Sequence, residues 1–400
     1  MRRLLAAGAV AAIAATALLA GGALRSGDDA AAAPTSRQLI RVGFRELDAA
    51  RRTGEPTHYG RAEEALREAL DGDGQDAEAL VGLASLANSR HRFREGLRLA
   101  RQARRLAPDT AVVDAVLGDS LVELGRYDEA FRGFDRLAAR KPGLTAYSRV
   151  SYARELLGHQ AQAIEAMRLA VDAAGDSGEP AAWSRTQLGK LYFSQGRLHE
   201  AAAQYRAALE LRPGYVQALD ALAHVEAARG RLRAATSLER QAVAQTALPQ
   251  YAGFLGDLYR LQGSARRADE QYRLVAAVDR LFVANGVATD LELSLFNVDH
   301  GFRLTESVAR ARRALAERPG IEAEGVLAWA LARTGRCGEA LRHSERALRL
   351  GTLDAPKFFQ RGMIERCLGR RAASQRWFHR ALRTNPYFSP AWAPVARRLS

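Results

Sequence analysis

Small and hydrophobic residues recur at helical spacing along most of this chain, and short polar turns separate the segments that carry them. The clearest stretch reads Leu188-Gly189, Tyr192, Gly196-Arg197-Leu198, Ala201, Tyr205, Ala208 and Pro213. Apolar positions three and four apart predict amphipathic helices, the second glycine predicts a turn, and the proline predicts the end of the second helix. Runs of Val, Ile and Thr typical of strands are rare. The pattern therefore predicts an antiparallel helix pair in an all-α chain.

The same order of small, aromatic and turn residues returns at nearly regular intervals along the chain. Matching units begin at Ala77, Ala111, Leu144, Ala182, Val216, Pro249, Ala288, Ile321 and Ala355, and six of the eight spacings are 33 or 34 residues. Position 15 of the unit is glycine in seven of the nine, and position 20 is always Gly, Ala or Ser. A turn and a close crossing of two helices are therefore expected in every unit.

This unit resembles the tetratricopeptide repeat, in which Leu-Gly, Tyr, Ala, an aromatic residue and Pro follow in this order. The resemblance covers about Arg37 to Leu399. It implies an α-solenoid, a right-handed superhelix of about ten helix pairs with a C-terminal capping helix. In this family position 8 is small because helix A crosses helix B there, and positions 24 and 27 pack against the next unit. The chain resembles secreted or membrane-anchored bacterial proteins of this family from GC-rich genomes.

The predicted organisation is a leader at 1–24, a flexible linker at 25–36 and a superhelix at 37–399. The units lie near 37–76, 77–110, 111–143, 144–181, 182–215, 216–248, 249–287, 288–320, 321–354 and 355–388, with a cap at 389–399. The first unit is degenerate, with helices expected over Arg37 to Arg52 and Tyr59 to Leu70. In the cap, Pro390 suits the first turn of a helix and Pro394 would strain it.

Two units are longer than the others. The unit from Leu144 contains the segment Gly175 to Pro180, which is predicted to be a polar turn between helices. In the unit from Pro249, the second helix is expected to run to Phe282 and to stop at Asn285-Gly286. The acidic segment Asp290 to His300 follows. Either a long helix simply bends the array there, or the segment is a ligand or partner site.

Residues Leu4 to Leu24 carry no charge and follow Met1-Arg2-Arg3. A basic start and an apolar stretch of this length are typical of a signal peptide, and also of a signal anchor that remains in the membrane. Both place the repeats outside the plasma membrane. No cysteine follows the apolar stretch, which excludes a lipoprotein anchor. The expected localisation is extracytoplasmic, secreted or anchored, with the membrane as a partner only if the leader is uncleaved.

The formal net charge of +14 would by itself suit binding to nucleic acids. However, all but three of the 59 basic residues are arginines, scattered at helical spacing as a GC-rich genome would produce, so no nucleic-acid partner is expected. Cys337 and Cys367 are too few for a zinc site or a disulfide framework. They fall at neighbouring helix ends of consecutive units. We expect them either within the Cα separation of about 7 Å that a disulfide needs, or as two small packing residues.

Sequence motifs for catalysis are missing. The chain has no Gly-rich phosphate loop, Gly-x-Ser-x-Gly elbow or His-Glu-x-x-His helix. The segment from Asp71 begins like an EF-hand loop, but Asp76 and Gly82 stand where Gly and Glu are required. We therefore expect no enzyme activity, no cofactor and no metal site. The Lys and Asn that form the two-carboxylate clamp in some members of the family are also absent.

In this family, positions 2, 5, 9, 12 and 13 of helix A line the concave groove. These positions hold nine carboxylates and four bases here, which gives the groove a net charge of −5. Aromatic residues lie beside them, and at least one of Trp183 and Trp329 should be partly exposed. Such a groove suits an extended, possibly basic peptide, although inward polar residues could also serve only solubility. The candidate residues are Asp119, Glu123, Tyr152, Glu155, Trp183, Phe193, Asp257, Glu292, Phe296, Asp299, His300 and Trp329.

Three functions remain open at this point. The chain is expected to be an extracytoplasmic scaffold that binds a protein or peptide in its groove. Alternatively, it is a ligand or metal-ion binding accessory protein centred on residues 290–300. A third possibility is a non-catalytic subunit of an envelope enzyme or transporter complex.

Overall fold

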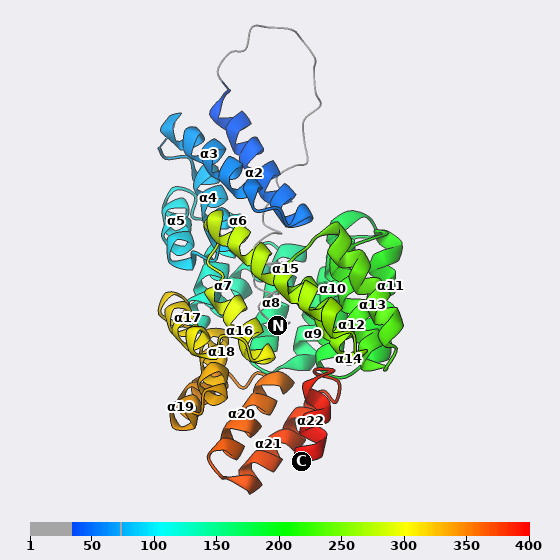
Figure 1. Ribbon diagram of the computed structural model, residues 1–400. Coiled ribbons are helices and arrows are strands. Elements are labelled where there is room, and N and C mark those ends of the chain that lie inside the picture. Colours follow the sequence, from blue (N-terminus) through cyan, green and yellow to red (C-terminus); the bar gives the residue numbers. More distant parts are fainter. Residues whose placement is uncertain (1–33, 73) are drawn as a thin grey trace. The chain divides into compact units, whose positions relative to one another are not determined.

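The computed structural model describes residues 34–72 and 74–400. Within these ranges the chain forms 21 helices and no strand. No helix among the described residues is long and apolar enough to cross a membrane. The predicted leader, Leu4 to Leu24, and nearly all of the predicted linker lie outside the described residues. The described part of the chain is an all-α solenoid, as the sequence predicts (Figure 1).

The described chain divides into two compact units. The smaller contains the described residues up to 141 and residues 281–288. Its helices are α2 (Ser36–Thr53), α3 (Thr57–Gly72), α4 (Ala77–Ser89), α5 (Phe93–Leu106), α6 (Ala111–Glu123) and α7 (Tyr127–Arg140).

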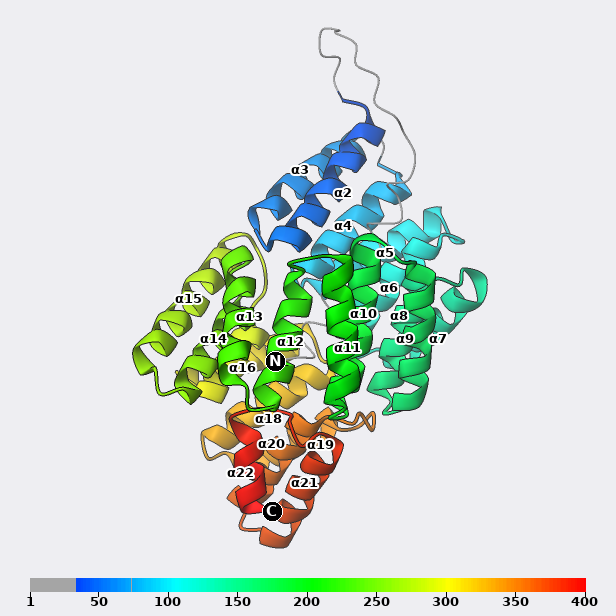
Figure 2. The same ribbon diagram turned by 90° about the vertical axis from the view of Figure 1, so that its right-hand side faces the viewer.

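The larger unit contains residues 142–280 and 289–400. Its helices are α8 (Leu144–Leu156), α9 (Gln160–Ala174), α10 (Gly178–Ser194), α11 (Leu198–Leu211), α12 (Val216–Ala228), α13 (Leu232–Gln245), α14 (Pro249–Leu261), most of α15 (Ala265–Ala284), α16 (Asp290–His300), α17 (Leu304–Glu317), α18 (Ile321–Arg333), α19 (Cys337–Ala347), α20 (Ala355–Cys367), α21 (Arg371–Thr384) and α22 (Trp392–Leu399). Consecutive helices pack on one another, and α8 to α13 lie side by side in this way (Figure 2).

Three element ends differ from the prediction, each for a local reason. Helix α2 starts at Ser36 because Thr35 caps it, accepting a hydrogen bond from the backbone N–H of Gln38. Helix α10 starts at Gly178, so half of the expected polar turn is helical, and Pro180 stands in the first turn, where it is tolerated. Helix α22 starts at Trp392 and not near Ser389. The late start also puts Pro394 in the first turn and removes the expected strain.

Four close crossings inside the repeats join a glycine at position 8 to an aromatic ring at position 24 of the same repeat. A Cβ added at the glycine would lie 2.3 to 2.5 Å from the ring in each of the four pairs Gly118/Phe134, Gly189/Tyr205, Gly256/Tyr272 and Gly362/Phe378. The other five registered units have neither a glycine at position 8 nor an aromatic residue at position 24. Position 24 therefore fills its own repeat in these four units. Tyr205 and Tyr272 also pack against residues of the next unit, as expected.

In the smaller unit, the turn after α4 contacts the segment that follows α15. The ring Nδ1 of His91 lies 2.9 Å from the carbonyl oxygen of Ala288, whose N–H donates to the carbonyl of Arg90 at 3.0 Å. Arg92 Nε donates to the carbonyl of Gly286 at 3.1 Å. His91 occupies position 15 without being glycine and has a φ of 58°, a left-handed conformation that costs about 1 kcal/mol for a residue with a Cβ. The extra length of the 39-residue unit thus has a structural role.

Two similar contacts link distant repeats in the larger unit. Thr352 Oγ1 donates a hydrogen bond to the carbonyl oxygen of Leu156. Asn385 Nδ2 donates to the carbonyl oxygen of Phe193 at 2.9 Å. The partners are separated by 196 and 192 residues along the chain. These repeats therefore contact more than their immediate neighbours in sequence, unlike those of an open solenoid.

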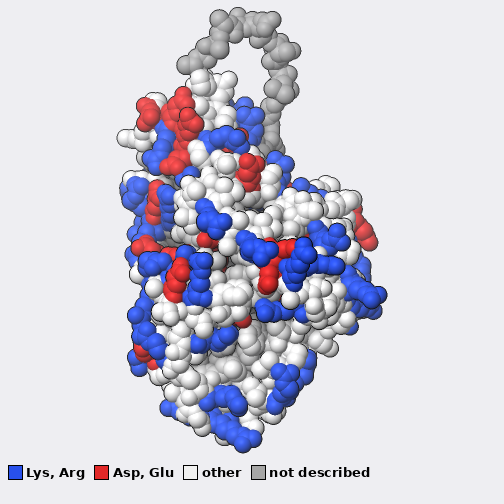
Figure 3. Space-filling model, viewed as in Figure 1, with Lys and Arg blue, Asp and Glu red and all other residues white. Residues whose placement is uncertain are grey.

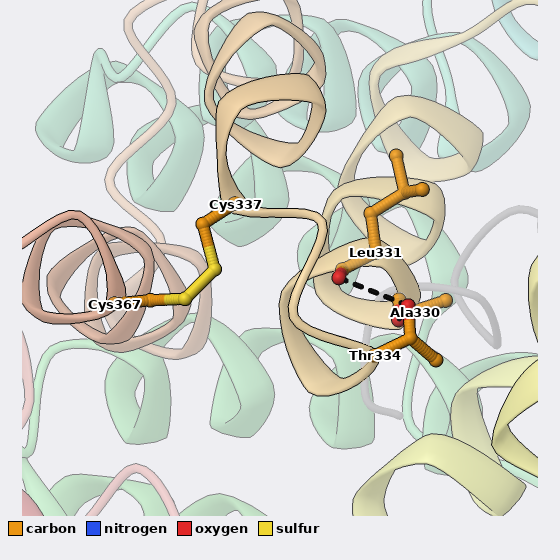
Figure 4. The surroundings of a disulfide bond; sticks show 5 residues. All are labelled: Ala330, Leu331, Thr334, Cys337 and Cys367. Atoms are coloured by element: carbon orange, nitrogen blue, oxygen red, sulfur yellow. Dashed lines mark hydrogen bonds between the residues drawn. A yellow bond between two sulfur atoms is a disulfide. The ribbon is translucent and has the colours of Figure 1, made fainter.

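A disulfide joins Cys337 at the start of α19 to Cys367 at the end of α20 (Figure 4). The two Cα atoms are 6.1 Å apart, which confirms the expectation that these helix ends lie close enough to be bridged. The bond closes a loop over a sequence separation of 30 residues. That loop includes Thr352, which makes one of the long-range contacts described above.

Candidate functional site

Three polar side chains from three consecutive helices meet in the larger unit. Asp257 comes from α14, Tyr272 from α15 and His300 from the last turn of α16. His300 Nε2 lies 2.7 Å from Asp257 Oδ1, and the Tyr272 hydroxyl donates to the same oxygen at 2.9 Å. Asp257 and His300 are both among the candidate residues, so the structure brings this pair together. Tyr272 could not be identified from the sequence, because position 24 of the repeat is expected only to pack.

His300 has an acceptor at each ring nitrogen. Nδ1 lies 2.6 Å from the carbonyl oxygen of Phe296, and Nε2 faces the Asp257 carboxylate. Both contacts can be hydrogen bonds at once only if both nitrogens carry a proton, that is, in the imidazolium form. Burial lowers the pKa of His300, but the hydrogen bond and charge of Asp257, with the Phe296 carbonyl, outweigh it and raise the pKa overall. Burial, followed by the Asp257 charge, also raises the pKa of Tyr272, which keeps its hydroxyl protonated.

Aromatic rings surround this polar group. The His300 ring lies 4.7 Å from the Tyr272 ring, 4.3 Å from the Phe296 ring and 5.8 Å from the Phe302 ring, with which it is stacked. Phe302 is 36% exposed, and the Asp257 side chain is 30% exposed. An apolar ring and a carboxylate are therefore both open to solvent within one patch, which we call the His300 patch: Asp257, Tyr272, Phe296, His300 and Phe302.

The turn that carries Phe302 has an unusual backbone. Gly301 has a φ of 78° and Arg303 a φ of 42°, so a residue with a Cβ occupies the left-handed region. Only His91 shares this property among the other non-glycine residues of the described chain. Position 15 in this repeat is Phe302 and not glycine. Strain of this kind, of the order of 1 to 3 kcal/mol, concentrates at functional sites, and here it presents the Phe302 ring.

Replacing His300 by Gln should lower stability most at mildly acidic pH. A raised histidine pKa contributes stability that is fully present below the unfolded value, about 6.5, and is lost as the pH rises through the folded value. The difference in unfolding free energy between the wild type and His300→Gln should therefore be largest near pH 6 and shrink toward pH 9. Urea unfolding at a series of pH values measures it. A difference that stays constant or grows with pH would show that His300 is not a charged partner of Asp257.

Trp329 is a packing residue and not an exposed groove residue. It is 1% exposed, and its ring contacts the rings of Phe359 and Trp392 at 6.3 and 6.1 Å. Its Nε1 donates to Asp299 Oδ1 at 2.8 Å, and Arg333 lies over its ring. The expected closeness of Asp299 and Trp329 is present, but as an internal hydrogen bond. Burial raises the pKa of Asp299.

The first predicted aromatic cluster also fails as a set of exposed residues. Trp183 is 3% exposed and Phe193 is equally buried, so the expectation that one of the two tryptophans is partly exposed is wrong. Helix α10 packs against α9, α11 and α12, which covers it on several sides. Phe193 belongs to a hydrophobic core with Tyr205 and Leu222. Tyr152 is buried and Glu155 half-buried on α8.

The predicted groove carboxylates are largely paired within the fold. Glu292 Oε1 accepts from Arg318 at 2.9 Å, and Glu322 Oε1 accepts from Lys357 at 2.6 Å. Arg318 and Lys357 are both buried, and neither occupies a position counted as groove-lining. The net charge of −5 therefore overstates the acidity of this surface. Burial of a charge favours pairing with an opposite charge. A count of charges at the groove-lining positions ignores such partners when they occupy other positions.

The remaining acidic candidates give no metal site. The Asp290 carboxylate, from the acidic segment, is held by Arg310 and Arg313 at 3.3 and 3.1 Å. No group of three His, Cys, Asp or Glu that could hold a metal ion occurs in the described part of the chain. Asp119 and Glu123 lie on α6 of the smaller unit, where both are buried. Asp76 caps α4 through the backbone N–H groups of residues 78 and 79, so the segment before it is a linker with a helix cap.

Comparison with known proteins supports the repeat assignment. The model of the TPR repeat family matches residues 189–230. This match begins at the glycine of the Gly189/Tyr205 crossing and runs into the next repeat. Residues 189–230 are therefore a tetratricopeptide repeat segment within this all-α solenoid. No curated protein matches the sequence.

Solved structures of tetratricopeptide proteins match parts of the chain. A thermophilic TPR protein of Thermus thermophilus, TTC0263, is 24% identical over 48% of this chain and 98% of its own, with a TM-score of 0.43. A tetratricopeptide repeat protein from Parabacteroides merdae is 14% identical over 62% of this chain and 98% of its own, with a TM-score of 0.43. YrrB, a TPR protein described as having an unusual peptide-binding site, is 20% identical over 45% and 91%, with a TM-score of 0.31.

Proposed function

We propose that this protein is an extracytoplasmic tetratricopeptide repeat scaffold that binds a protein or an extended peptide at the His300 patch. The observation that carries the proposal is the partly exposed Phe302 ring beside the partly exposed Asp257 carboxylate, both in contact with the half-buried His300. Asp257 and His300 occupy positions 9 and 13 of helix A, which line the concave groove in this family. An aromatic anchor next to a charge that fixes orientation is the usual composition of a binding hot spot.

The geometry favours an extended segment with both an apolar and a basic side chain. Phe302 offers an apolar face, and Asp257 keeps one carboxylate oxygen, Oδ2, outside the hydrogen bonds of Tyr272 and His300, which both reach Oδ1. A Lys or Arg of the partner could bind Oδ2 as a charge-assisted hydrogen bond. This narrower region replaces the long acidic groove that position counting predicts.

The extracytoplasmic setting is supported by the disulfide. A bond between Cys337 and Cys367 persists in oxidising compartments and is rare in reducing ones. The uncharged stretch from Leu4 to Leu24 agrees with export. The absence of enzyme activity, and of binding to nucleic acids, remains a prediction from sequence.

Selection from a phage-displayed library of short random peptides on the full chain tests the proposal. Peptides with a basic and an apolar residue should be enriched. Phe302→Ala should weaken their binding about fivefold or more, because removal of a central aromatic anchor typically costs above about 1 kcal/mol. Fluorescence anisotropy with labelled peptides measures the affinity.

Leu169→Ala provides the matched control for this measurement. Leu169 lies on α9 and is 44% exposed. Its replacement by Ala therefore removes a similar amount of exposed apolar surface far along the sequence from Phe302. The affinity of this variant for the enriched peptides should equal that of the wild type. Equal losses in both variants, or no enriched peptide, would contradict binding at the His300 patch.

The metal-binding alternative finds no support in the described residues. The carboxylate of Asp290, the first residue of the acidic segment, is bound by two arginines. A role as a non-catalytic subunit of an envelope complex is a special case of the scaffold proposal. It requires only that the peptide be part of a larger partner.

A further inference from the structure

The last 35 residues of the chain contain no carboxylate side chain. Residues 366–400 hold eight arginines and neither Asp nor Glu: Arg366, Arg370, Arg371, Arg376, Arg380, Arg383, Arg397 and Arg398. More than half of the total net charge of +14 therefore lies in this segment. A coding bias toward arginine does not explain the loss of acidic residues, which are frequent in the other repeats.

Helix α21 presents much of this charge on one face. Arg376, His379, Arg380 and Arg383 are exposed and stand at spacings of three and four residues, so they form one stripe. The opposite face, which includes Phe378 and Ala381, is buried. The space-filling view shows Lys and Arg side chains and no Asp or Glu over α21 and α22 on the visible face (Figure 3).

These charges are not neutralised within the fold. Of the eight arginines, only Arg370 makes an ion pair with another described residue, Glu365 at 3.5 Å. The second helix of another repeat, α17, differs because its arginines are paired: Arg310 and Arg313 both form ion pairs with Asp290. A dense, unpaired stripe raises self-repulsion, and a partner with negative charge would relieve it.

An aromatic residue lies at the edge of the stripe. Trp377 is half-buried, and the guanidinium carbons of Arg361 and Arg380 lie 5.3 and 5.2 Å from the centre of its ring. Tryptophan is enriched where one end of the ring meets apolar groups and the other meets water, as at the surface of a lipid bilayer. Arginine side chains beside it can reach lipid headgroups while their methylene groups stay on the protein.

We propose that the exposed face of α21 binds the anionic headgroups of a membrane surface. A fluid array of headgroups can match a straight stripe of arginines without a shaped pocket, and each basic residue near such a surface adds a similar increment of binding. The partial apolar exposure of Trp377 fits the same interface. This surface lies on the second helix of its repeat and shares no residue with the His300 patch. The proposal therefore does not depend on peptide binding there.

Co-sedimentation of the full chain with phosphatidylcholine vesicles, with and without phosphatidylglycerol, tests this inference. Phosphatidylglycerol should increase binding about tenfold or more. The triple variant Arg376→Gln, Arg380→Gln, Arg383→Gln should bind the vesicles that contain phosphatidylglycerol about tenfold or more weakly than the wild type does. The basic start of the leader is the same in the wild type and in the triple variant, so the difference between these two proteins on phosphatidylglycerol isolates the contribution of α21.

The matched control removes three charges from another exposed stripe, Arg98→Gln, Arg101→Gln, Arg105→Gln on α5. It should retain the phosphatidylglycerol effect within about twofold. Equal losses in both triple variants, or displacement of the protein from vesicles by poly-glutamate at equal charge, would overturn the proposal. The first would show a general charge effect, and the second a surface for acidic proteins.

A second measurement does not depend on the triple variant folding. Brominated phosphatidylglycerol should quench part of the tryptophan fluorescence of the wild type, and Trp377→Phe should lose that part. Quenching that is unchanged in Trp377→Phe would place the membrane contact elsewhere and contradict the assignment of α21.

Discussion

Removing the disulfide between Cys337 and Cys367 is expected to lower the free energy of unfolding by about 3.5 kcal/mol. The bond closes a loop over a sequence separation of 30 residues, and the loss of loop entropy from the unfolded chain predicts a contribution of this size. The loop contains the start of α20 and Thr352, which holds Leu156 of a distant repeat. Urea unfolding of the double variant Cys337→Ser, Cys367→Ser should therefore show a lower midpoint than the oxidised wild type.

Reduction of the wild type provides the control. The reduced wild type should unfold at the same midpoint as the double variant, and reductant should leave the double variant unchanged. Equal stability of the oxidised wild type and the double variant would contradict the prediction. Two reactive thiols in the purified, unreduced protein would show that the bond does not form.

A methyl group at Gly189 should destabilise the protein by about 2 to 3 kcal/mol. A Cβ there would lie 2.4 and 2.7 Å from two ring atoms of Tyr205, and Tyr205 is completely buried, so the ring cannot move without disturbing the core. The same substitution usually stabilises a helix, by about 0.5 to 1 kcal/mol. The clash must therefore exceed that gain, and urea unfolding of Gly189→Ala measures the net effect.

Gly60→Ala is the matched control for this substitution. Gly60 lies within α3, is exposed, and has no atom within 4 Å of an added Cβ. The variant should be as stable as the wild type or slightly more stable. If Gly189→Ala behaves in the same way as Gly60→Ala, the glycine-to-ring crossing does not determine the packing of these repeats.

The helix pairs were predictable because their signals are local. Glycine at position 15 takes the left-handed turn in seven units, as at Gly196 with a φ of 73°, and only the two units without it have left-handed residues with a Cβ near the turn. The late start of α22 was not predicted, because two prolines, Pro390 and Pro394, each allow a helix start and the sequence does not choose between them. The structure selects Pro394.

The candidate site was predictable only in part. Asp257, Phe296 and His300 were found because they share groove-lining positions, and the structure brings them together. Lys357 was missed because its charge meets Glu322 of the preceding repeat, and Arg318 because it meets Glu292 from the far end of the same repeat. Such pairs depend on how helices stack. The exposure of Trp183 and Trp329 was predicted wrongly because position within a repeat does not reveal what packs over it, as Trp392 packs over Trp329.

Photo-cross-linking from position 302 tests the scaffold proposal most directly. The full chain carries a benzophenone amino acid in place of Phe302 or, as control, of Leu169, and is irradiated with a peptide enriched by the selection described above. The proposal predicts a covalent peptide adduct from position 302 and none from position 169. An adduct from position 169 alone, or from neither position, would contradict peptide binding at the His300 patch.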